Sequence, residues 1–156
     1  MSNEPENTTA FLNEILQRTR PEDISKVLER YADKLIPEAG AFSVYVRALI
    51  KKNGLTQQEV FLRAFIPERY GYKLISGEKT TQRRDVLIRI FLAAGFTIKE
   101  AQHALRLYGM PELYSRIDRD AVLMIALNSG MSDPFEVDEL LEKHGMEPLS
   151  PCGAEP

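Results

Sequence analysis

The chain has 156 residues, of which 44% are hydrophobic and 28% charged, and its formal net charge is −3. This is the composition of an ordinary globular protein, and the length suffices for one compact domain with its own core. The first ten residues, MSNEPENTTA, lack the basic and apolar segments of a signal peptide, and no apolar run approaches a membrane span. The single cysteine, Cys152, excludes an internal disulfide. We therefore expect a cytoplasmic protein that does not enter a membrane.

Charge is distributed unevenly along the chain. Residues 1–40 and 96–156 have net charges of −3 and −6, whereas residues 41–95 hold 10 Lys/Arg and 4 Asp/Glu, a net charge of +6. A local basic patch, rather than a basic whole, is what binding to phosphates requires. The middle segment is therefore the candidate for nucleic-acid contact.

The first forty residues are expected to form a helical hairpin. Residues 1–7 are predicted to be disordered, and Thr8–Thr19 carries its apolar residues on one helical face. A capping box at Thr19-Arg20-Pro21-Glu22 predicts a second helix that reaches Leu35. The break at 37–40 separates this acidic hairpin, residues 8–40, from the rest of the chain. The hairpin could dock on the core, pair between subunits or recruit a partner.

A short helix-turn-helix pattern comes after an amphipathic helix that begins near Phe42. Thr56-Gln57-Gln58-Glu59 reads as a capping box, and Pro67 fits the first turn of another helix that Gly77 terminates. This second helix is expected to turn Leu74 inward and to present a polar, partly basic face outward. Two such helices at a fixed angle suit the major groove of DNA.

At these residues the chain resembles the Xre/Cro, or lambda-repressor-like, family of helix-turn-helix regulators. The shared features are the opening Leu-Thr-Gln-x-Glu, small Ala64, apolar Ile66 and the closing Gly77, and the resemblance covers roughly residues 42–95. It implies an all-α fold with a five-helix DNA-binding domain at residues 41–113. It also implies a regulator of transcription that binds double-stranded DNA, as a homodimer with two recognition helices in successive major grooves.

Three residues depart from the family pattern. Phe61 replaces a small residue, Phe65 replaces the turn glycine, and Gly71 stands where a branched apolar residue is usual. Because cores tolerate exchanges that keep the total volume, we expect the ring of Phe61 or Phe65 to fill the space beside Gly71.

The resemblance also implies which residues meet DNA. Gln57 would hold a phosphate and support the recognition helix, Arg69 would read a guanine, and a tyrosine of that helix would touch a thymine methyl group or a phosphate. The loop after the helix and the start of the next helix would lie near the backbone. The predicted contacts are Gln57, Glu68, Arg69, Tyr70, Tyr72, Lys73, Lys79, Thr81 and Arg83.

The chain repeats itself from Arg84 onward. Residues 84–113 align with residues 119–149, with one extra residue in the second copy. Each copy predicts an apolar helix, a glycine cap, an N-capped second helix and another glycine cap, and two such hairpins are expected to stack. The first copy completes the five-helix domain, and the second, residues 114–149, extends it as an acidic hairpin. A Pro/Gly tail at 150–156 is expected to be disordered.

Catalytic constellations are absent from the sequence. His103 and His144 have no metal-ligand spacing, and no glycine-rich phosphate loop exists, so we expect neither an enzyme nor a bound metal or cofactor. Two functions remain. The first is a sequence-specific DNA-binding regulator, whose acidic terminal helices supply dimer or partner contacts. The second is a helical interaction module that keeps the helix-turn-helix skeleton and binds protein instead of DNA.

Overall fold

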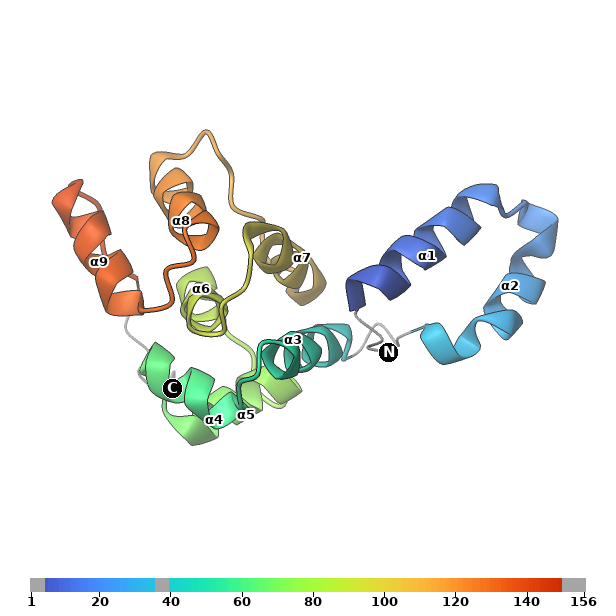
Figure 1. Cartoon of the computed structure of the whole chain (residues 1–156), viewed down its shortest axis with the longest axis horizontal. Coiled ribbons are helices and arrows are strands. Elements are labelled where there is room, and N and C mark those ends of the chain that lie inside the picture. The colour runs from blue at the N-terminus through green and yellow to red at the C-terminus, as the bar shows by residue number, and fades with distance from the viewer. Residues whose placement is uncertain (1–4, 36–39, 150–156) are drawn as a thin grey trace. The chain divides into compact units, whose positions relative to one another are not determined.

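The computed structural model describes residues 5–35 and 40–149, and the regular secondary structure of these ranges is helical (Figure 1). The predicted all-α class is therefore confirmed. The chain divides into two compact units, Met1–Ala41 and Phe42–Pro156, which are described separately. The predicted disorder of residues 1–4 and 150–156 falls outside the described residues, as does most of the predicted break at 37–40.

The first unit is a helical hairpin, as expected, but its details differ from the prediction. It consists of α1 (Pro5–Arg18), a 3₁₀ turn (Pro21–Asp23), α2 (Ile24–Arg30) and a second 3₁₀ turn (Ala32–Lys34). Residues 5–7 belong to α1, so the prediction that all of residues 1–7 are disordered is wrong at these three positions.

The capping box predicted at Thr19 does not form. The Thr19 hydroxyl donates to the carbonyl of Ile15 at 2.7 Å, and the N-cap of the first 3₁₀ turn is Arg20, which makes no side-chain cap. A threonine at the end of a helix can bond back to the preceding turn, and this bond competes with capping of the next helix. The expected single helix is consequently split into two 3₁₀ turns and a short α2.

The second unit begins with an amphipathic helix, followed by the two helices of the helix-turn-helix pattern. These are α3 (Ala41–Lys52), α4 (Gln57–Ala64) and α5 (Glu68–Ser76). Leu74 of α5 is fully buried, and Gly77 ends α5 in the left-handed conformation. The apolar face of α3 is also buried as its spacing predicts, through Phe42, Val46, Leu49 and Ile50.

The turn between α4 and α5 is made without glycine. The Thr56 hydroxyl caps α4 by accepting from the Glu59 amide at 3.1 Å, and Pro67 is the N-cap of α5. Phe65 takes the left-handed conformation, with φ of 55°, which a residue with a side chain rarely adopts. Its ring meets that of Phe135 at a centroid distance of 4.3 Å.

The expected compensation for Gly71 is present. A Cβ atom built on Gly71 would lie 2.5–2.7 Å from three ring atoms of Phe61, so the phenyl ring occupies the space that a larger residue would need. Phe61 is buried and Phe65 is exposed. Of the two candidates, Phe61 is therefore the one that fills the notch.

The two repeats together contain four helices, and each of these helices packs against two of the others to form a closed ring (Figure 1). They are α6 (Arg84–Ala93), α7 (Ile98–Tyr108), α8 (Asp118–Asn128) and α9 (Pro134–Lys143). Helix α6 packs against α7 and α9, and α8 packs against the same two helices. The predicted stacking of the two hairpins is confirmed, and α4 covers the remaining side of α6.

Reciprocal ion pairs join the two repeats. Arg84 of the first repeat bonds Asp120 of the second, and Arg119 of the second forms two 2.9 Å hydrogen bonds with Asp85 of the first. These bonds raise the pKa of Arg119 above its usual value. Each repeat thus gives its arginine and its aspartate to the other, which is the exchange made by partners across a two-fold axis.

Each repeat also ties down its own end in the same way. Arg84 donates to the carbonyls of Pro111 and Glu112, and Arg119 donates to those of Glu147 and Pro148. A side chain of the second helix of each repeat accepts from the amide of the final leucine. Gln102 accepts from Leu113 at 2.7 Å, and Asp138 accepts from Leu149 at 2.8 Å.

Candidate nucleic-acid interface

The outward face of α5 is polar and partly basic. Glu68, Arg69, Tyr72 and Ser76 are exposed, whereas the opposite face is buried. Helix α5 also has the segregation of polar and apolar faces that a helix needs to pack on one side and meet a ligand on the other. Arg69 is therefore available at the surface, as the sequence predicts.

Tyr70 does not lie on this face. The sequence predicts that it points outward, but only 6% of it is exposed. Tyr70 precedes Leu74 by one helical turn, and residues four apart share a face, so burial of Leu74 brings Tyr70 into the core with it. The prediction of an outward Tyr70 is wrong, and the side chain is not on the surface that DNA would meet.

Tyr72 is exposed and also supports the fold. Its ring meets the ring of Phe61 edge to face at 5.0 Å, and 40% of the residue remains accessible. Phe61 is the residue that fills the Gly71 notch. Tyr72 thus covers that notch from outside while part of its side chain stays at the surface.

Two acidic side chains belong to this region: Glu68, itself a predicted contact and exposed, and Glu78, which follows α5. The Lys73 ammonium is 3.9 Å from the Glu78 carboxylate, and Glu68 accepts a 3.4 Å hydrogen bond from Gln58. The Lys79 amide donates to the Lys73 carbonyl at 3.1 Å, which fixes the loop after α5. Lys79 itself is exposed, so Lys73 and Lys79 place two positive charges at the end of α5.

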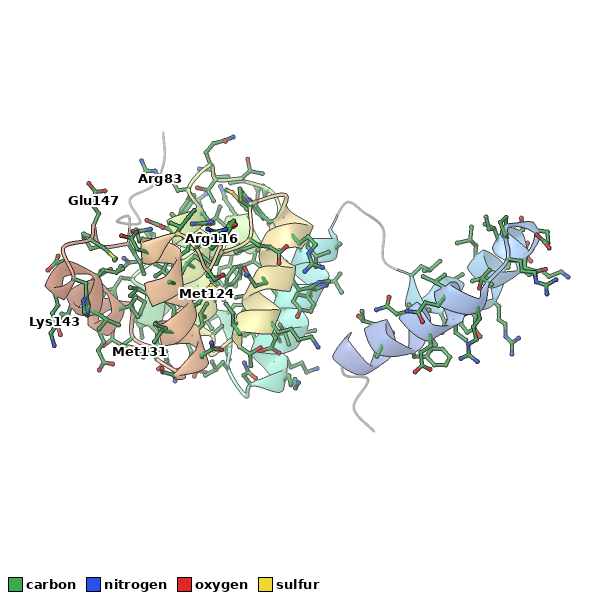
Figure 2. The ribbon with its side chains drawn as sticks, turned by 90° about the horizontal axis from the view of Figure 1, so that it is seen from above. Arg83, Arg116, Met124, Met131, Lys143 and Glu147 are labelled. Carbon is green, nitrogen blue, oxygen red and sulfur yellow. The ribbon has the colours of Figure 1, made fainter. Side chains whose placement is uncertain are left out.

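Thr81 is a structural residue rather than a surface contact. It is 4% exposed, its amide donates to the Tyr108 hydroxyl at 2.7 Å, and its hydroxyl accepts from the Arg83 amide at 3.0 Å. The predicted exposure of Thr81 to a phosphate is therefore wrong. Arg83, the N-cap residue of α6, is exposed, and Figure 2 shows its side chain at the edge of the unit.

Gln57 is the first residue of α4 and is partly buried. Its side-chain oxygen is buried and has no hydrogen-bond partner in the described part of the chain. A buried polar atom without a partner costs free energy, and such atoms are uncommon in folded proteins. The N-terminus of α4 therefore contains an amide whose hydrogen bonding is incomplete.

A patch that sequence reasoning missed lies beside the turn. Leu62, Phe65 and Phe135 are exposed, with Leu62 at 77%, and a groove of about 320 Å³ runs past Leu62, Phe65 and Asp133. We call Leu62, Phe65 and Phe135 the turn patch. The sequence contained one signal of the turn patch, because Leu62 lies off the apolar face that the spacing of α4 predicts. It contained no signal for the part played by Phe135, which belongs to the distant helix α9.

The sequence analysis also did not identify a buried arginine that bonds the end of α4, next to the turn. Arg89 of α6 is 5% exposed and donates to the Ala64 carbonyl at 3.1 Å. Its guanidinium also lies 3.8 Å from the carboxylate of Asp138 on α9. The end of α4 is thus held by α6 and α9 together, which connects the second repeat to the helix-turn-helix.

No cluster of His, Cys, Asp or Glu that could hold a metal ion occurs in residues 5–35 and 40–149. In the same ranges no helix is both long and apolar enough to cross a membrane. Comparisons with protein-family models, with curated proteins and with solved structures found no match. The resemblance to the Xre/Cro family remains an interpretation of the residues quoted above.

Proposed function

We propose that the protein is a sequence-specific regulator that binds double-stranded DNA through the helix-turn-helix α4–α5 and acts as a homodimer. The observation that carries this proposal is the coincidence of the helix-turn-helix with the basic segment. Nine of the ten Lys/Arg in residues 41–95 are at least partly exposed, and four of these lie on α5, in the loop after it or at the N-cap of α6: Arg69, Lys73, Lys79 and Arg83. Phosphate contacts by such residues supply most of the affinity of DNA-binding proteins.

Individual roles can be assigned to several of these residues. Arg69, on the exposed face of the first turn of α5, is the candidate for bidentate bonding to a guanine. Lys73, Lys79 and Arg83 are candidates for phosphate contacts. Gln57 is a candidate phosphate contact through its side-chain NH2 group, which can donate to a phosphate oxygen at the N-terminus of α4. Its unpartnered oxygen is an acceptor, so a phosphate would not satisfy it.

The experiment is a salt titration with random-sequence duplex DNA. Wild type is compared with Arg69→Ala/Lys73→Ala at ~50 and ~200 mM salt, where loss of the Lys73 phosphate contact is expected to lower the salt slope by about 1 and loss of the Arg69 charge to weaken binding further. The control variant, Lys99→Ala/Lys143→Ala, removes the same charge from exposed residues of the repeats, and Lys143 is seen at the surface in Figure 2.

The outcome decides between two functions. Steep salt dependence that weakens in the α5 variant and not in the control supports DNA binding, and selection of a binding site from random sequences would be the next step. Absence of binding at the lower salt concentration removes the proposal.

The alternative is a protein-interaction module on a helix-turn-helix scaffold. The turn patch favours it, because clustered exposed apolar side chains mark interaction surfaces. Leu62→Ser/Phe135→Ser would then abolish partner binding, while leaving any DNA binding through α5 unchanged.

A further inference from the structure

The hairpin α1–α2 has apolar side chains but no core. Of the described side chains in residues 8–35, none is buried. The two helices meet through the rings of Phe11 and Tyr31, at a centroid distance of 5.8 Å, and each ring stays accessible. The second unit, by contrast, contains many side chains with no accessible surface.

Large apolar side chains are left half exposed along the hairpin. Phe11, Leu16, Ile24, Leu28 and Leu35 are each between 42% and 52% accessible. Segments below about 40 residues rarely fold without a metal, a disulfide or association with another chain. No cysteine lies in the hairpin, and no metal-ligand cluster occurs in its described residues. Packing of the hairpin against a further surface is the remaining source of stability, and the charges of the hairpin bear on the choice of that surface.

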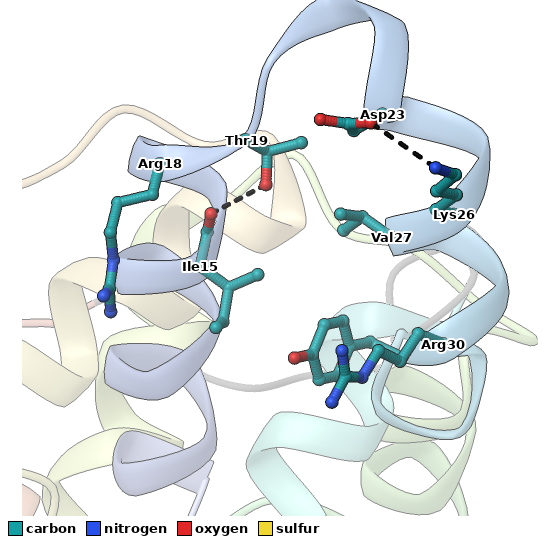
Figure 3. Close-up of a pocket in the computed structure, with 8 residues that line it drawn as sticks. Ile15, Arg18, Thr19, Asp23, Lys26, Val27 and Arg30 are labelled. Carbon is teal, nitrogen blue, oxygen red and sulfur yellow. Dashed lines mark hydrogen bonds and ion pairs between the residues drawn. The ribbon is translucent and has the colours of Figure 1, made fainter.

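A cleft opens between α1 and α2 where a helical bundle would have its core (Figure 3). It has a volume of about 340 Å³, and its apolar lining comes from Ile15, Val27 and Tyr31. Arg18, Lys26 and Arg30 stand around this lining together with Asp23, whose carboxylate lies 4.0 Å from the Lys26 ammonium (Figure 3). The rim therefore has an excess of basic groups over acidic ones, and it suits an occupant whose apolar side chains are flanked mainly by acidic ones.

The charges of the hairpin indicate which occupant fits. Residues 8–35 contain five Lys/Arg and five Asp/Glu, so their net charge is zero. A second copy meets this surface without net repulsion. It also brings exposed Glu14, Glu22 and Glu29 for the basic rim, together with the same apolar residues. A strongly acidic or strongly basic partner would match only part of the surface.

We infer that residues 8–35 are a self-association surface, on which the hairpins of two copies pair as a four-helix bundle. The bundle buries Phe11, Leu16, Ile24 and Leu28, and the basic rim of each hairpin faces acidic residues of the other. Such an interface is isologous, since each surface meets its own copy. This inference names the interface of the homodimer that the proposed function includes. It rests on the proposed function in one respect, which is that the protein forms a dimer.

The test measures the mass of the full chain by sedimentation equilibrium without DNA, from ~1 to ~100 μM, because dimerisation depends on concentration. Wild type is expected to dimerise, and Leu16→Glu/Leu28→Glu is expected to be monomeric. The controls are Leu62→Glu and Ile125→Glu, which place the same charge on exposed apolar residues of the second unit. Both controls are expected to dimerise like wild type.

A charge-exchange variant separates loss of contact from loss of folding. Leu16→Lys/Leu28→Lys is expected to be monomeric alone and to form a mixed dimer with the glutamate variant, because opposite charges then meet across the interface. Restoration of the dimer in the mixture supports pairing of the two hairpins. A hairpin that merely failed to fold would not be rescued.

Three results would overturn the inference. They are a monomeric wild type over the whole concentration range, a glutamate variant that remains dimeric, and two monomeric variants that do not associate when mixed. Failure of the proposed function has a different result, since a dimer that binds no DNA leaves the hairpin interface standing. A monomer that binds DNA removes the interface and leaves the function.

Discussion

The two repeats, residues 84–113 and 119–149, share one skeleton and have different surroundings. Both use an arginine to bond the carbonyls at the end of the repeat and an aspartate to bond the arginine of the other repeat. Both use glycines in the left-handed conformation, Gly95 and Gly109 in the first and Gly130 and Gly145 in the second. These bonds close each hairpin on itself and on the other.

The surfaces of the repeats differ where their neighbours differ. Ile90 of α6, the helix that packs against α4, α7 and α9, is fully buried, whereas its equivalent on α8, Ile125, is 60% exposed. His103 of α7 packs edge to face on Tyr45 of α3 at 4.6 Å, whereas its equivalent on α9, Glu139, is exposed. The bonds that both repeats share hold the two hairpins together. The other positions of the two repeats differ because each is packed against different neighbours or exposed to solvent.

The largest effect is expected from the more buried of the two ion pairs. Asp120 has 3% of its side chain accessible and also accepts from the Tyr114 amide at 2.9 Å. Asp120→Ala leaves Arg84 without its carboxylate and is expected to cost about 3 kcal/mol of unfolding free energy. Denaturant unfolding of the full chain measures it.

The matched change in the other pair is Asp85→Ala. Arg119 and Arg84 both keep their carbonyl partners, but the Asp85 side chain is 16% accessible and so less buried than that of Asp120, and a smaller loss of about 1–2 kcal/mol is expected. Equal losses from the two variants would show that the reciprocal pairs contribute alike despite their different burial.

A second effect tests why α6 has an arginine where α8 has a methionine. Arg89→Met removes the bond to the buried Ala64 carbonyl and the pair with Asp138, and is expected to cost about 2–3 kcal/mol. The reverse change at the equivalent position, Met124→Arg, is expected to cost less than about 0.5 kcal/mol, because Met124 is partly exposed (Figure 2). The same unfolding measurement compares them, and a neutral Arg89→Met would contradict the supporting role.

The tail bond of the first repeat gives a smaller effect. Gln102 both donates to the Leu113 carbonyl at 2.8 Å and accepts from its amide. Gln102→Ala is expected to cost about 1–2 kcal/mol, since two backbone groups lose their partner. In the second repeat Asp138→Asn keeps an acceptor for the Leu149 amide but leaves the buried Arg89 without its carboxylate, so a loss of about 1–2 kcal/mol is expected there too, from the lost charge instead of the tail bond. No loss for Asp138→Asn would show that the charge of Asp138 does not stabilise Arg89.

The smallest effect is a pH dependence of stability that comes from His103 of the first repeat. Burial, with the nearby positive charge of Arg106, lowers the pKa of His103 below its ordinary value of 6.5. The unfolded chain therefore binds the proton more readily, and His103 contributes a loss of stability as the pH falls through 6.5. Denaturant unfolding at about pH 8 and about pH 5.5 measures this, and His103→Gln is expected to reduce the dependence. An unchanged dependence in that variant would assign it to other groups.

Local signals predicted much of the fold. Gly77, Gly95 and Gly109 mark helix ends because a left-handed cap depends on one residue, and the Thr97 capping box is present as its spacing predicts. The filling of the space beside Gly71 by a phenylalanine was also predictable, since the departures lie in one short motif and offset each other in volume, but the choice of Phe61 over Phe65 came from the structure.

The parts that failed did so for different reasons. The inward position of Tyr70 follows from local spacing, because Leu74, four residues later, was expected to face the core and shares the face of Tyr70. The burial of Thr81 had no local signal, because its amide bonds the hydroxyl of Tyr108, 27 residues later. The alignment of the repeats identified Arg84 with Arg119 and Asp85 with Asp120 as equivalents. It could not show that each arginine bonds the aspartate of the other repeat, because equivalence in sequence does not specify pairing in space.

The reciprocal exchange between the repeats limits how the chain could grow by duplication. In an open array of repeats, each added unit packs on the exposed end of the array and exposes an identical end of its own, so further units can be added singly. Here Arg84, Asp85, Arg119 and Asp120 are all engaged within one pair of hairpins. A third copy inserted after Leu149 would find no acceptor for its arginine and no donor for its aspartate. Lengthening this protein would therefore require whole pairs of hairpins to be added, two at a time.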